Sequence, residues 1–286
     1  FGTMAIHRNL TKSQLVDLRK KLPRLLNQQN YVNIVLSKIR PNPDANYEGN
    51  YLIQRQHLNE IWNFVRQLAP AHNSLKANVL YHRLVLDRSE GNFDRDVFTD
   101  YIKLPRNMSY VNSDYINLDE NKRDLCNFST NFRPQTLLPP IGNDSAIVSD
   151  YLQHFFKSDQ DYKSFATYLK SSYLKRQFAE AKIVNGLGSS EKWAALLSPA
   201  EYQQIKERVG LSFTHANQFD YLPNDQVAIE LNVKNVSKLI VKVFEINTQN
   251  YYRDRLTEID TNIELDGLLP NQETVYEYSE TPFIQK

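Results

Sequence analysis

The titratable side chains best suited to acid/base chemistry in this sequence are His82, Asp87 and His154. Imidazoles and a carboxylate can exchange protons near neutral pH, so a pocket that gathered these three would fit a hydrolase-type enzyme. No motif joins them, and no two of the six histidines have the four-residue separation that places two zinc ligands on one helical face. We therefore predict no catalytic residue, no metal and no cofactor, and keep an enzyme with a site converging in the helical region as the alternative hypothesis.

An acidic run that begins at Asp87 is similar in composition to a calcium-binding loop. Its sequence is DRSEGNFDRDVF, with oxygen-bearing side chains at alternate positions. An EF-hand loop needs Gly at its sixth position and Glu at its twelfth, whereas this run has Gly91 at the fifth and Phe98 at the twelfth. We interpret the run as a polar turn between two helices.

The sequence lacks the motifs of nucleophilic and nucleotide-dependent enzymes. It has no Gly-x-Ser-x-Gly elbow, and Gly186-Leu-Gly188 has neither the third glycine nor the preceding strand of a dinucleotide site. The single cysteine, Cys126, excludes an internal disulfide and has no assigned base near it, so we interpret it as a structural residue. These absences favour a protein that is not an enzyme.

Length and composition indicate a globular chain of more than one domain. The 286 residues exceed the usual size of a single domain, and 41% of them are hydrophobic, which is enough to form a sizeable core. The 34 basic and 33 acidic residues are interspersed and give a net charge of +1, so we expect no nucleic-acid partner. No apolar run is long enough to span a bilayer, so we expect no membrane insertion.

Helix signals dominate the first two thirds of the chain. Thr11 and Ser198 are each followed three residues later by Gln or Glu, which is the pattern of a capping box at a helix start. A helix over 199–209 follows from the second of these boxes, and Gly210 stands where a left-handed residue would end it.

We predict a mainly α-helical domain over residues 1–208. The stretch 106–142 interrupts it, because Asn, Ser, Asp and Pro residues are frequent there and hydrophobic periodicity is weak. We expect this stretch to be a long irregular segment packed across the helices.

Beyond Gly210 the hydrophobic period changes from helical spacing to the two-residue alternation of a strand. The alternation is carried by Val227, Ile229, Leu231 and Val233. Strands are predicted over 226–234 and 238–246, with weaker candidates at 263–265 and 274–278. The fold class is therefore α+β multidomain, with the helical domain followed by an antiparallel β-sandwich over 211–286.

We expect this sandwich to be incomplete. Four or five strands in about 75 residues are fewer than the seven that close an immunoglobulin-type sandwich. An incomplete sandwich leaves an unpaired strand edge, so self-association through that edge is one expected contact. Our hypothesis is that the sequence is the amino-terminal piece of a longer protein.

Tyr251 and Tyr252 are candidate partner contacts, because exposed tyrosines suit protein interfaces. Carboxylates follow them at Glu258, Asp260, Glu264 and Asp266. Aromatic rings beside carboxylates also suit a sugar or metal site, so a carbohydrate-binding sandwich is a further alternative. We favour the structural interpretation, in which these acids pair with nearby arginines across strands.

Part of the β region resembles a known family. Tyr221-Leu-Pro-Asn-Asp-Gln-Val, Leu239-Ile-Val-Lys-Val-Phe-Glu-Ile-Asn-Thr and Asn250-Tyr-Tyr-Arg are similar to the opening of the macroglobulin-type β-sandwich found in alpha-2-macroglobulin-like proteins. The segment that begins at Glu258 is similar to one in long uncharacterised proteins that combine helices with such sandwiches. The thioester motif Gly-Cys-Gly-Glu-Gln is absent, so the resemblance implies a non-catalytic module and no protease trapping.

These observations predict a non-catalytic interaction or scaffold region of a larger protein. Its expected partners are other proteins or the remainder of the parent chain, bound through the sandwich or the helical surface. No sequence feature identifies a particular partner.

Overall fold

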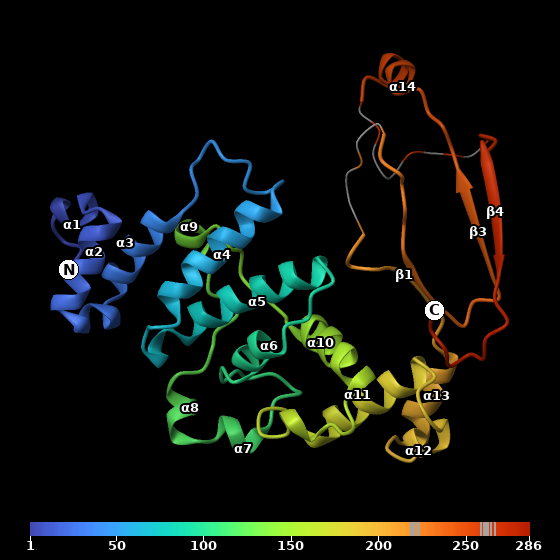
Figure 1. Ribbon diagram of the computed structural model, residues 1–286, viewed down its shortest axis with the longest axis horizontal. Helices are drawn as coiled ribbons and strands as arrows, with labels where there is room; N and C mark the ends of the chain where they lie inside the picture. Colours follow the sequence, from blue (N-terminus) through green and yellow to red (C-terminus); the bar gives the residue numbers. More distant parts are fainter. Residues whose placement is uncertain (218–220, 222–223, 258, 260–262, 264, 266) are drawn as a thin grey trace.

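The computed structural model describes residues 1–286 with the exception of 218–220, 222–223, 258, 260–262, 264 and 266. Helices make up the chain as far as residue 207, and short strands with one further helix follow them (Figure 1). The α-helices are α1 Ala5–Asn9, α2 Lys12–Lys21, α3 Gln29–Ile39, α4 Tyr51–Val65, α5 Asn73–Ser89, α6 Arg95–Ile102, α7 Ser113–Ile116, α8 Asp119–Arg123, α9 Arg133–Thr136, α10 Ser145–Ser158, α11 Ser171–Val184, α12 Ser190–Ala194, α13 Pro199–Glu207 and α14 Thr248–Arg255. The 3-10 helices are η1 Pro23–Asn27, η2 Pro70–His72 and η3 Lys163–Phe165, and the strands are β1 Gly210–Phe213, β2 Leu231–Lys234, β3 Lys238–Val243 and β4 Gln272–Glu277.

Both predicted capping boxes are confirmed. The Thr11 amide donates to Gln14 Oε1 at 2.9 Å, and Thr11 Oγ1 accepts from the Gln14 amide at 3.3 Å. Ser198 makes the same reciprocal bonds with Glu201 at 2.9 and 3.3 Å. These bonds satisfy amide groups that have no partner inside the first helical turn. They therefore fix the starts of α2 and α13.

The prediction for Gly210 is wrong. This glycine does not adopt a left-handed conformation at the end of α13 but begins strand β1, opposite Lys234 of β2. The reason lies two residues earlier, because Arg208 is already extended, with φ −58° and ψ 117°. The chain thus leaves the helix in a strand-like direction and needs no left-handed residue.

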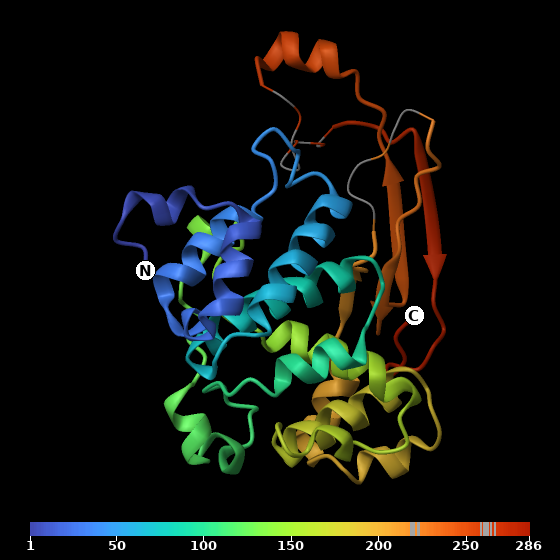
Figure 2. The ribbon, with the colours of Figure 1, turned by 60° about the vertical axis from the view of Figure 1, so that its left-hand side comes forward.

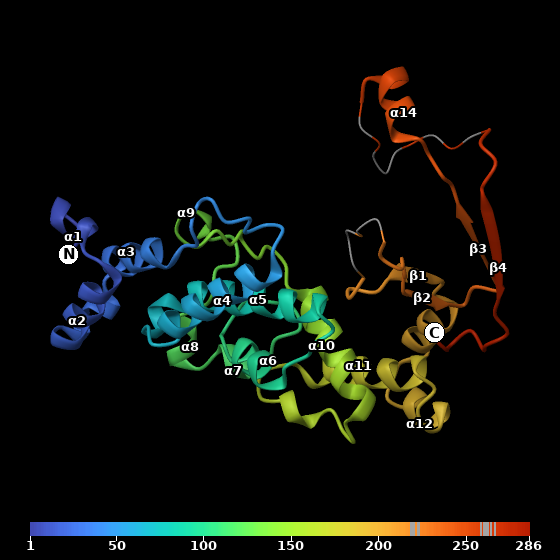
Figure 3. The same cartoon turned by 45° about the horizontal axis from the view of Figure 1, so that its top comes forward.

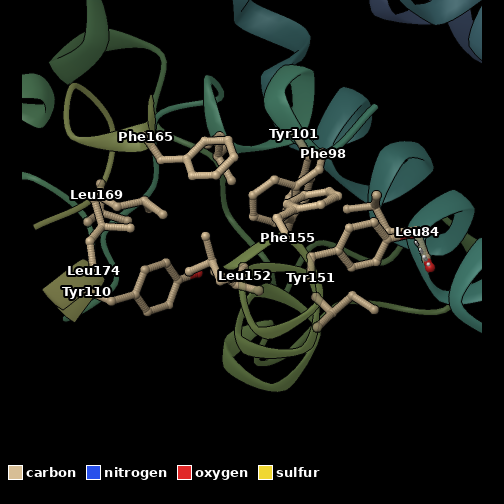
Figure 4. Close-up of a cluster of buried hydrophobic side chains, with 14 of the residues drawn as sticks. Leu84, Phe98, Tyr101, Tyr110, Tyr151, Leu152, Phe155, Phe165, Leu169 and Leu174 are labelled. Atoms are coloured by element: carbon tan, nitrogen blue, oxygen red, sulfur yellow. Dashed lines mark hydrogen bonds between the residues drawn. The ribbon is translucent and has the colours of Figure 1, made fainter. Parts of the chain in front are cut away.

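The helices enclose two adjoining hydrophobic cores, and α5 contributes to both. Leu80 and Leu84 of α5 lie in a core formed mainly with α6, α10 and α11. Aromatic rings fill much of this core (Figure 4), and Phe98 stacks on Tyr151 with ring centroids 5.3 Å apart. Leu75, Val79 and Leu86 of α5 lie in the second core, with α2, α3 and α4. Burial on two sides makes α5 the central helix of the molecule.

The segment 106–142, predicted as irregular, contains the three short helices α7, α8 and α9. Asn112 provides a local start signal, because its side chain accepts from the Asp114 amide at the beginning of α7. The segment is packed against the helical core through Tyr110 and Val111, which are 4% and 2% exposed. The segment thus packs on the helices and is irregular between its three short helices.

A buried ion pair joins this segment to α10. Arg106 and Asp144 are 1% and 0% exposed, and Arg106 Nε lies 3.1 Å from Asp144 Oδ2. Tyr101 donates its hydroxyl to the same carboxylate at 2.7 Å, and the Tyr110 hydroxyl donates to it as well. Arg106 Nη1 also donates to the carbonyls of Tyr101, Ile102 and Leu104. The charges are thus paired inside the core and fix where the chain leaves α6.

The strands form two separate two-stranded antiparallel sheets in the described part of the chain. β1 pairs with β2, and β3 pairs with β4. The ribbon of β3 and β4 extends away from α12 and α13, and α14 lies at its far end (Figures 1 and 2). This arrangement confirms the predicted fold class, a helical region followed by antiparallel sheets.

The predicted strands agree with the observed ones to different extents. The strand expected over 226–234 is present as β2 only from Leu231, and the candidate at 274–278 corresponds to β4. The expected strand at 238–246 is confirmed as β3 over its first six residues. The candidate at 263–265 falls partly outside the described residues.

Removal of the buried carboxylate tests the importance of the ion pair. We expect Asp144→Ala to lower the free energy of unfolding by about 3–5 kcal/mol, because Arg106 would remain buried without a counter-charge. Chemical denaturation followed by circular dichroism measures this change. Asp100→Ala is the matched control, because the exposed Asp100–Lys103 pair should contribute less than about 1 kcal/mol. Equal losses for the two variants would contradict a special role for the buried pair.

Candidate interaction surfaces

Most of the large exposed hydrophobic side chains in the described chain lie after α13. They are Val209, Leu211, Phe213, Val227, Ile229, Ile240, Val243, Tyr252, Leu256, Leu268, Leu269, Val275 and Tyr276. Exposed apolar groups that cluster in one region are typical of surfaces that bind other proteins. The β region is therefore the first place to look for an interaction surface.

The ribbon of β1 and β2 has one apolar face. Leu211 and Phe213 lie opposite Val233 and Leu231 in the strand register, so their side chains share that face. Leu211 and Phe213 are 54% and 67% exposed. These two residues were not predicted as surface contacts from the sequence, although their alternation with Val209 indicates a strand with one apolar face.

The ribbon of β3 and β4 has two different faces. Leu239 and Val241 lie opposite Tyr276 and Thr274 on one face, which is mostly apolar. The opposite face has Ile240 and Val275 at its centre, and the charged pairs Lys238/Glu277 and Lys242/Glu273 flank them. Lys242 Nζ lies 3.8 Å from Glu273 Oε2. Alternation of this kind is typical of a sheet that packs one face against another layer.

A buried lysine fastens the β1–β2 ribbon to the helical region. Lys234 is 2% exposed, and its Nζ donates to the carbonyls of Ile205 at 2.6 Å, Arg208 at 3.1 Å and Pro282 at 2.5 Å. Two of these carbonyls belong to the end of α13, where a helix leaves acceptors unpaired and favours a cation. Burial lowers the pKa of Lys234. This contact sets the position of the ribbon relative to α13.

A hollow of about 510 Å³ lies between this ribbon and helices α10 and α11. His215 Nε2 lies 3.3 Å from Asp150 Oδ2, and Arg88 also contacts that carboxylate. Arg208 Nη1 donates to Glu180 Oε1 at 2.6 Å on another wall. The acidic groups of the hollow are thus held by neighbouring cations, which is an arrangement suited to joining two regions.

The residues of the enzyme hypothesis do not share a pocket. His82 lines a hollow beside α4 and α9, and its Nε2 is 2.9 Å from the Pro139 carbonyl. Asp87 is 1% exposed and pairs with Arg55 at 2.7 Å. His154 lies in the hollow beside β1 and stacks on Phe93 at 4.1 Å. Burial lowers the pKa of both histidines. The geometry gives no acid/base set among these three groups.

Cys126 and the acidic turn have structural environments. Burial raises the pKa of the Cys126 thiol to about 12, which keeps it in the unreactive thiol form. The run that starts at Asp87 forms the end of α5 and the turn before α6, as interpreted from the sequence. Within the described residues, no group of three or more His, Cys, Asp or Glu is placed to hold a metal ion.

Tyr251 and Tyr252 lie on α14 and not on a strand. The Asn247 side chain starts this helix by accepting from the Asn250 amide at 3.0 Å. Tyr252 is 54% exposed, whereas Tyr251 is half-buried. The carboxylates expected beside them, at Glu258, Asp260, Glu264 and Asp266, lie outside the described residues. The carbohydrate-binding alternative therefore stays a prediction.

The fold and surfaces define a class: a helical region joined to antiparallel ribbons with exposed apolar faces. Comparison with known families gives the particular family. The model titled "Actin-binding protein F N-terminal domain" matches residues 1–209, and the model titled "AbpF first immunoglobulin-like domain" matches residues 239–286. This chain belongs to the actin-binding protein F family.

A curated relative agrees with this assignment. Actin-binding protein F of Dictyostelium discoideum is 33% identical over 290 aligned residues. The alignment covers 100% of this chain and 12% of the relative, so the chain spans about an eighth of the relative's length. No solved structure matches the chain.

The resemblance to alpha-2-macroglobulin-like proteins is wrong. The stretch used to infer it, from Leu239 onward, matches an immunoglobulin-like domain of the actin-binding protein F family. Two antiparallel strands with alternating apolar residues are common to both kinds of sandwich, so the pattern did not discriminate between them. None of the described helices is long and apolar enough to cross a bilayer.

Replacement of Lys234 tests how the ribbon is fastened. We expect Lys234→Met to leave the three acceptor carbonyls without their shared donor, at a cost of about 1–3 kcal/mol. Hydrogen exchange should then accelerate at the amides of β1, β2 and the last turn of α13. Lys242→Met, on the exposed face of β3, is the control and should leave these amides unchanged. Unchanged protection in Lys234→Met would show that other contacts hold the ribbon.

Proposed function

We propose that this chain is a non-enzymatic interaction region of a scaffold protein, and that its protein partner is actin. The observation that carries the proposal is the family match over residues 1–209, together with a relative whose name describes it as actin-binding. The separation of His82, Asp87 and His154 supports the absence of catalysis. The exposed apolar faces of the ribbons support protein binding.

We also propose two domains, a helical one over 1–208 and a β domain over 211–286. Support comes from the end of the first family match at residue 209 and from the change from helix to strand between α13 and β1. The lysine contact at Lys234 joins the two parts and gives them a defined orientation. Self-association through an unpaired edge of β3 or β4 is a further contact that this organisation permits.

Direct binding to filaments tests the proposed function. We expect the protein to sediment with filamentous actin and to saturate as the filament concentration rises, because a specific surface has a finite number of sites. An unrelated globular protein of similar mass, present in the same tubes, should stay in the supernatant. Failure of the protein to sediment at any filament concentration would overturn actin as the partner.

The tyrosines of α14 remain a proposed partner contact. If they lie in the interface, Tyr251→Ala/Tyr252→Ala should weaken binding to filamentous actin about tenfold, because central aromatic contacts each contribute on the order of 1 kcal/mol or more. Tyr51→Ala is the matched control, since Tyr51 is 47% exposed in the first turn of α4. An equal affinity for both variants and the unmodified protein would remove these tyrosines from the interface.

A further inference from the structure

The nearly even charge balance of the chain conceals a segregated basic region. Residues 1–40 contain eight basic residues and one acidic residue, Asp17, and so carry a net charge of +7. Since the whole chain carries +1, residues 41–286 carry −6. The expectation that the charges are interspersed is therefore wrong for the amino-terminal segment. The basic residues are Arg8, Lys12, Arg19, Lys20, Lys21, Arg24, Lys38 and Arg40.

These forty residues fold together as one lobe, which we call the basic lobe: α1, α2, η1 and α3. Its buried side chains, such as Leu15, Leu25 and Val32, form a core with Ile61 and Phe64 of α4. The lobe lies at the end of the molecule opposite the sheets (Figures 1 and 3). The positive charge is therefore held on a folded surface that projects away from the β region.

Only part of this charge is neutralised within the molecule. Lys12 pairs with Glu60 of α4 at 2.8 Å, and Lys20 pairs with Asp17 at 3.1 Å. Exposed cations without an ion pair to any other described residue are Arg8, Lys21, Arg24, Lys38 and Arg40, of which Arg40 donates to the Pro134 carbonyl. Cations concentrated on one surface repel one another, and an acidic partner would relieve that repulsion.

The lobe also has a hollow suited to carboxylate side chains. It has a volume of about 340 Å³ and lies along α3. Arg8, Asn33 and Ser37 line it together, so a charged donor and neutral polar groups face the same space. Guanidinium groups bind carboxylates well because their N–H groups match the two oxygens.

The chemistry of the lobe favours an acidic protein over a membrane or a nucleic acid. Most of its large apolar residues are buried in the core, and the exposed ones lie only at Met4 and Ile6, around the five-residue helix α1, and at Leu22 after α2. These three are too few to form the long apolar face of a helix that lies in a bilayer. Its aromatic rings are also engaged, because Phe1 stacks on His7 at 4.4 Å and Tyr31 is 1% exposed. Exposed rings that could stack on bases are thus absent from the lobe.

We propose that the basic lobe is the surface through which this chain binds an acidic patch on its protein partner. This inference rests on the proposed function, in which the partner is filamentous actin. The long-range part of the attraction is electrostatic, so affinity for filaments falls as salt rises from about 50 to about 200 mM. The apolar faces of the ribbons are left for other contacts at the opposite end of the molecule.

Charge reversal at unpaired positions tests the proposal. In the variant Lys21→Glu/Arg24→Glu/Lys38→Glu, affinity for filamentous actin in a sedimentation assay is expected to fall at least about tenfold at low salt. Its affinity should also depend less on salt than that of the unmodified protein. The neutral variant Lys21→Gln/Arg24→Gln/Lys38→Gln should show an intermediate loss. None of these side chains is buried, and circular dichroism melting verifies that each variant is folded.

The matched control reverses the same number of exposed cations elsewhere, as Lys122→Glu/Lys163→Glu/Lys175→Glu. Retained binding by this control, together with loss in the lobe variant, supports the proposal. If the unmodified protein binds and both charge-reversed variants bind equally well, the lobe is not the contact but actin remains the partner. If the unmodified protein does not bind filaments, the proposed function itself fails.

Two further probes decide between classes of partner. Vesicles of phosphatidylserine and phosphatidylcholine represent anionic membranes, and a 20-base-pair DNA duplex represents nucleic acid. Weaker binding to both than to filaments supports the assignment to a protein surface. If the unmodified protein binds either probe more tightly than filaments, and the lobe variant loses this binding, the assignment of the basic lobe to a protein partner is overturned.

Discussion

The buried pairing of Arg106 with Asp144 is the interaction on which the helical region depends. A guanidinium and a carboxylate removed from water are unfavourable unless they are paired and hydrogen-bonded. Here Tyr101 and Tyr110 donate to the carboxylate, and the carbonyls of Tyr101, Ile102 and Leu104 accept from the guanidinium, whose Nη2 has no partner among the described residues. These partners come from α6, from the start of the segment 106–142 and from the start of α10. The two charges find these partners only when α6, the segment and α10 are all in their native positions. The ion pair therefore favours this one arrangement of the three parts.

This requirement explains how a segment with weak hydrophobic periodicity acquires one conformation. Burial raises the pKa of Tyr110, so its hydroxyl stays protonated and remains a donor to Asp144. Burial disfavours a charged Arg106, but the pKa of Arg106 is raised because the Asp144 carboxylate beside it stabilises the charged form. Arg106 also lies over the Tyr101 ring at 4.7 Å. Polar contacts thus supply the order that apolar spacing does not provide.

Local signals in the sequence were sufficient for the starts of α2 and α13 and for the fold class. Thr11 and Ser198 act through residues three positions away, so their hydrogen bonds can be read from neighbouring letters. The strand of Lys238–Val243 was likewise visible from its apolar run. Gly210 was misread because the conformation of a helix end depends on where the following chain pairs, and its partner Lys234 is distant in sequence.

The surfaces were harder to predict than the elements. Arg106 and Lys234 are buried, but residue type alone does not distinguish a buried arginine or lysine from an exposed one. Only the fold shows the difference. The basic lobe is a different case, because its charge could have been counted directly. It was hidden by averaging over the whole chain, since residues 41–286 offset its charge almost completely. A composition summed over two regions with different surfaces therefore conceals the feature most relevant to binding.

The protein uses its buried cations differently from its exposed ones. Lys234 donates to carbonyls at the end of α13, and Arg106 does the same at the end of α6. Both side chains donate to backbone carbonyls inside the fold, so neither is free to bind a partner. Arg8, Lys21, Arg24 and Lys38 make no such bonds and stay exposed. Unpaired cations that share one folded surface repel one another and so do not stabilise the fold, which makes a binding partner the better explanation for them.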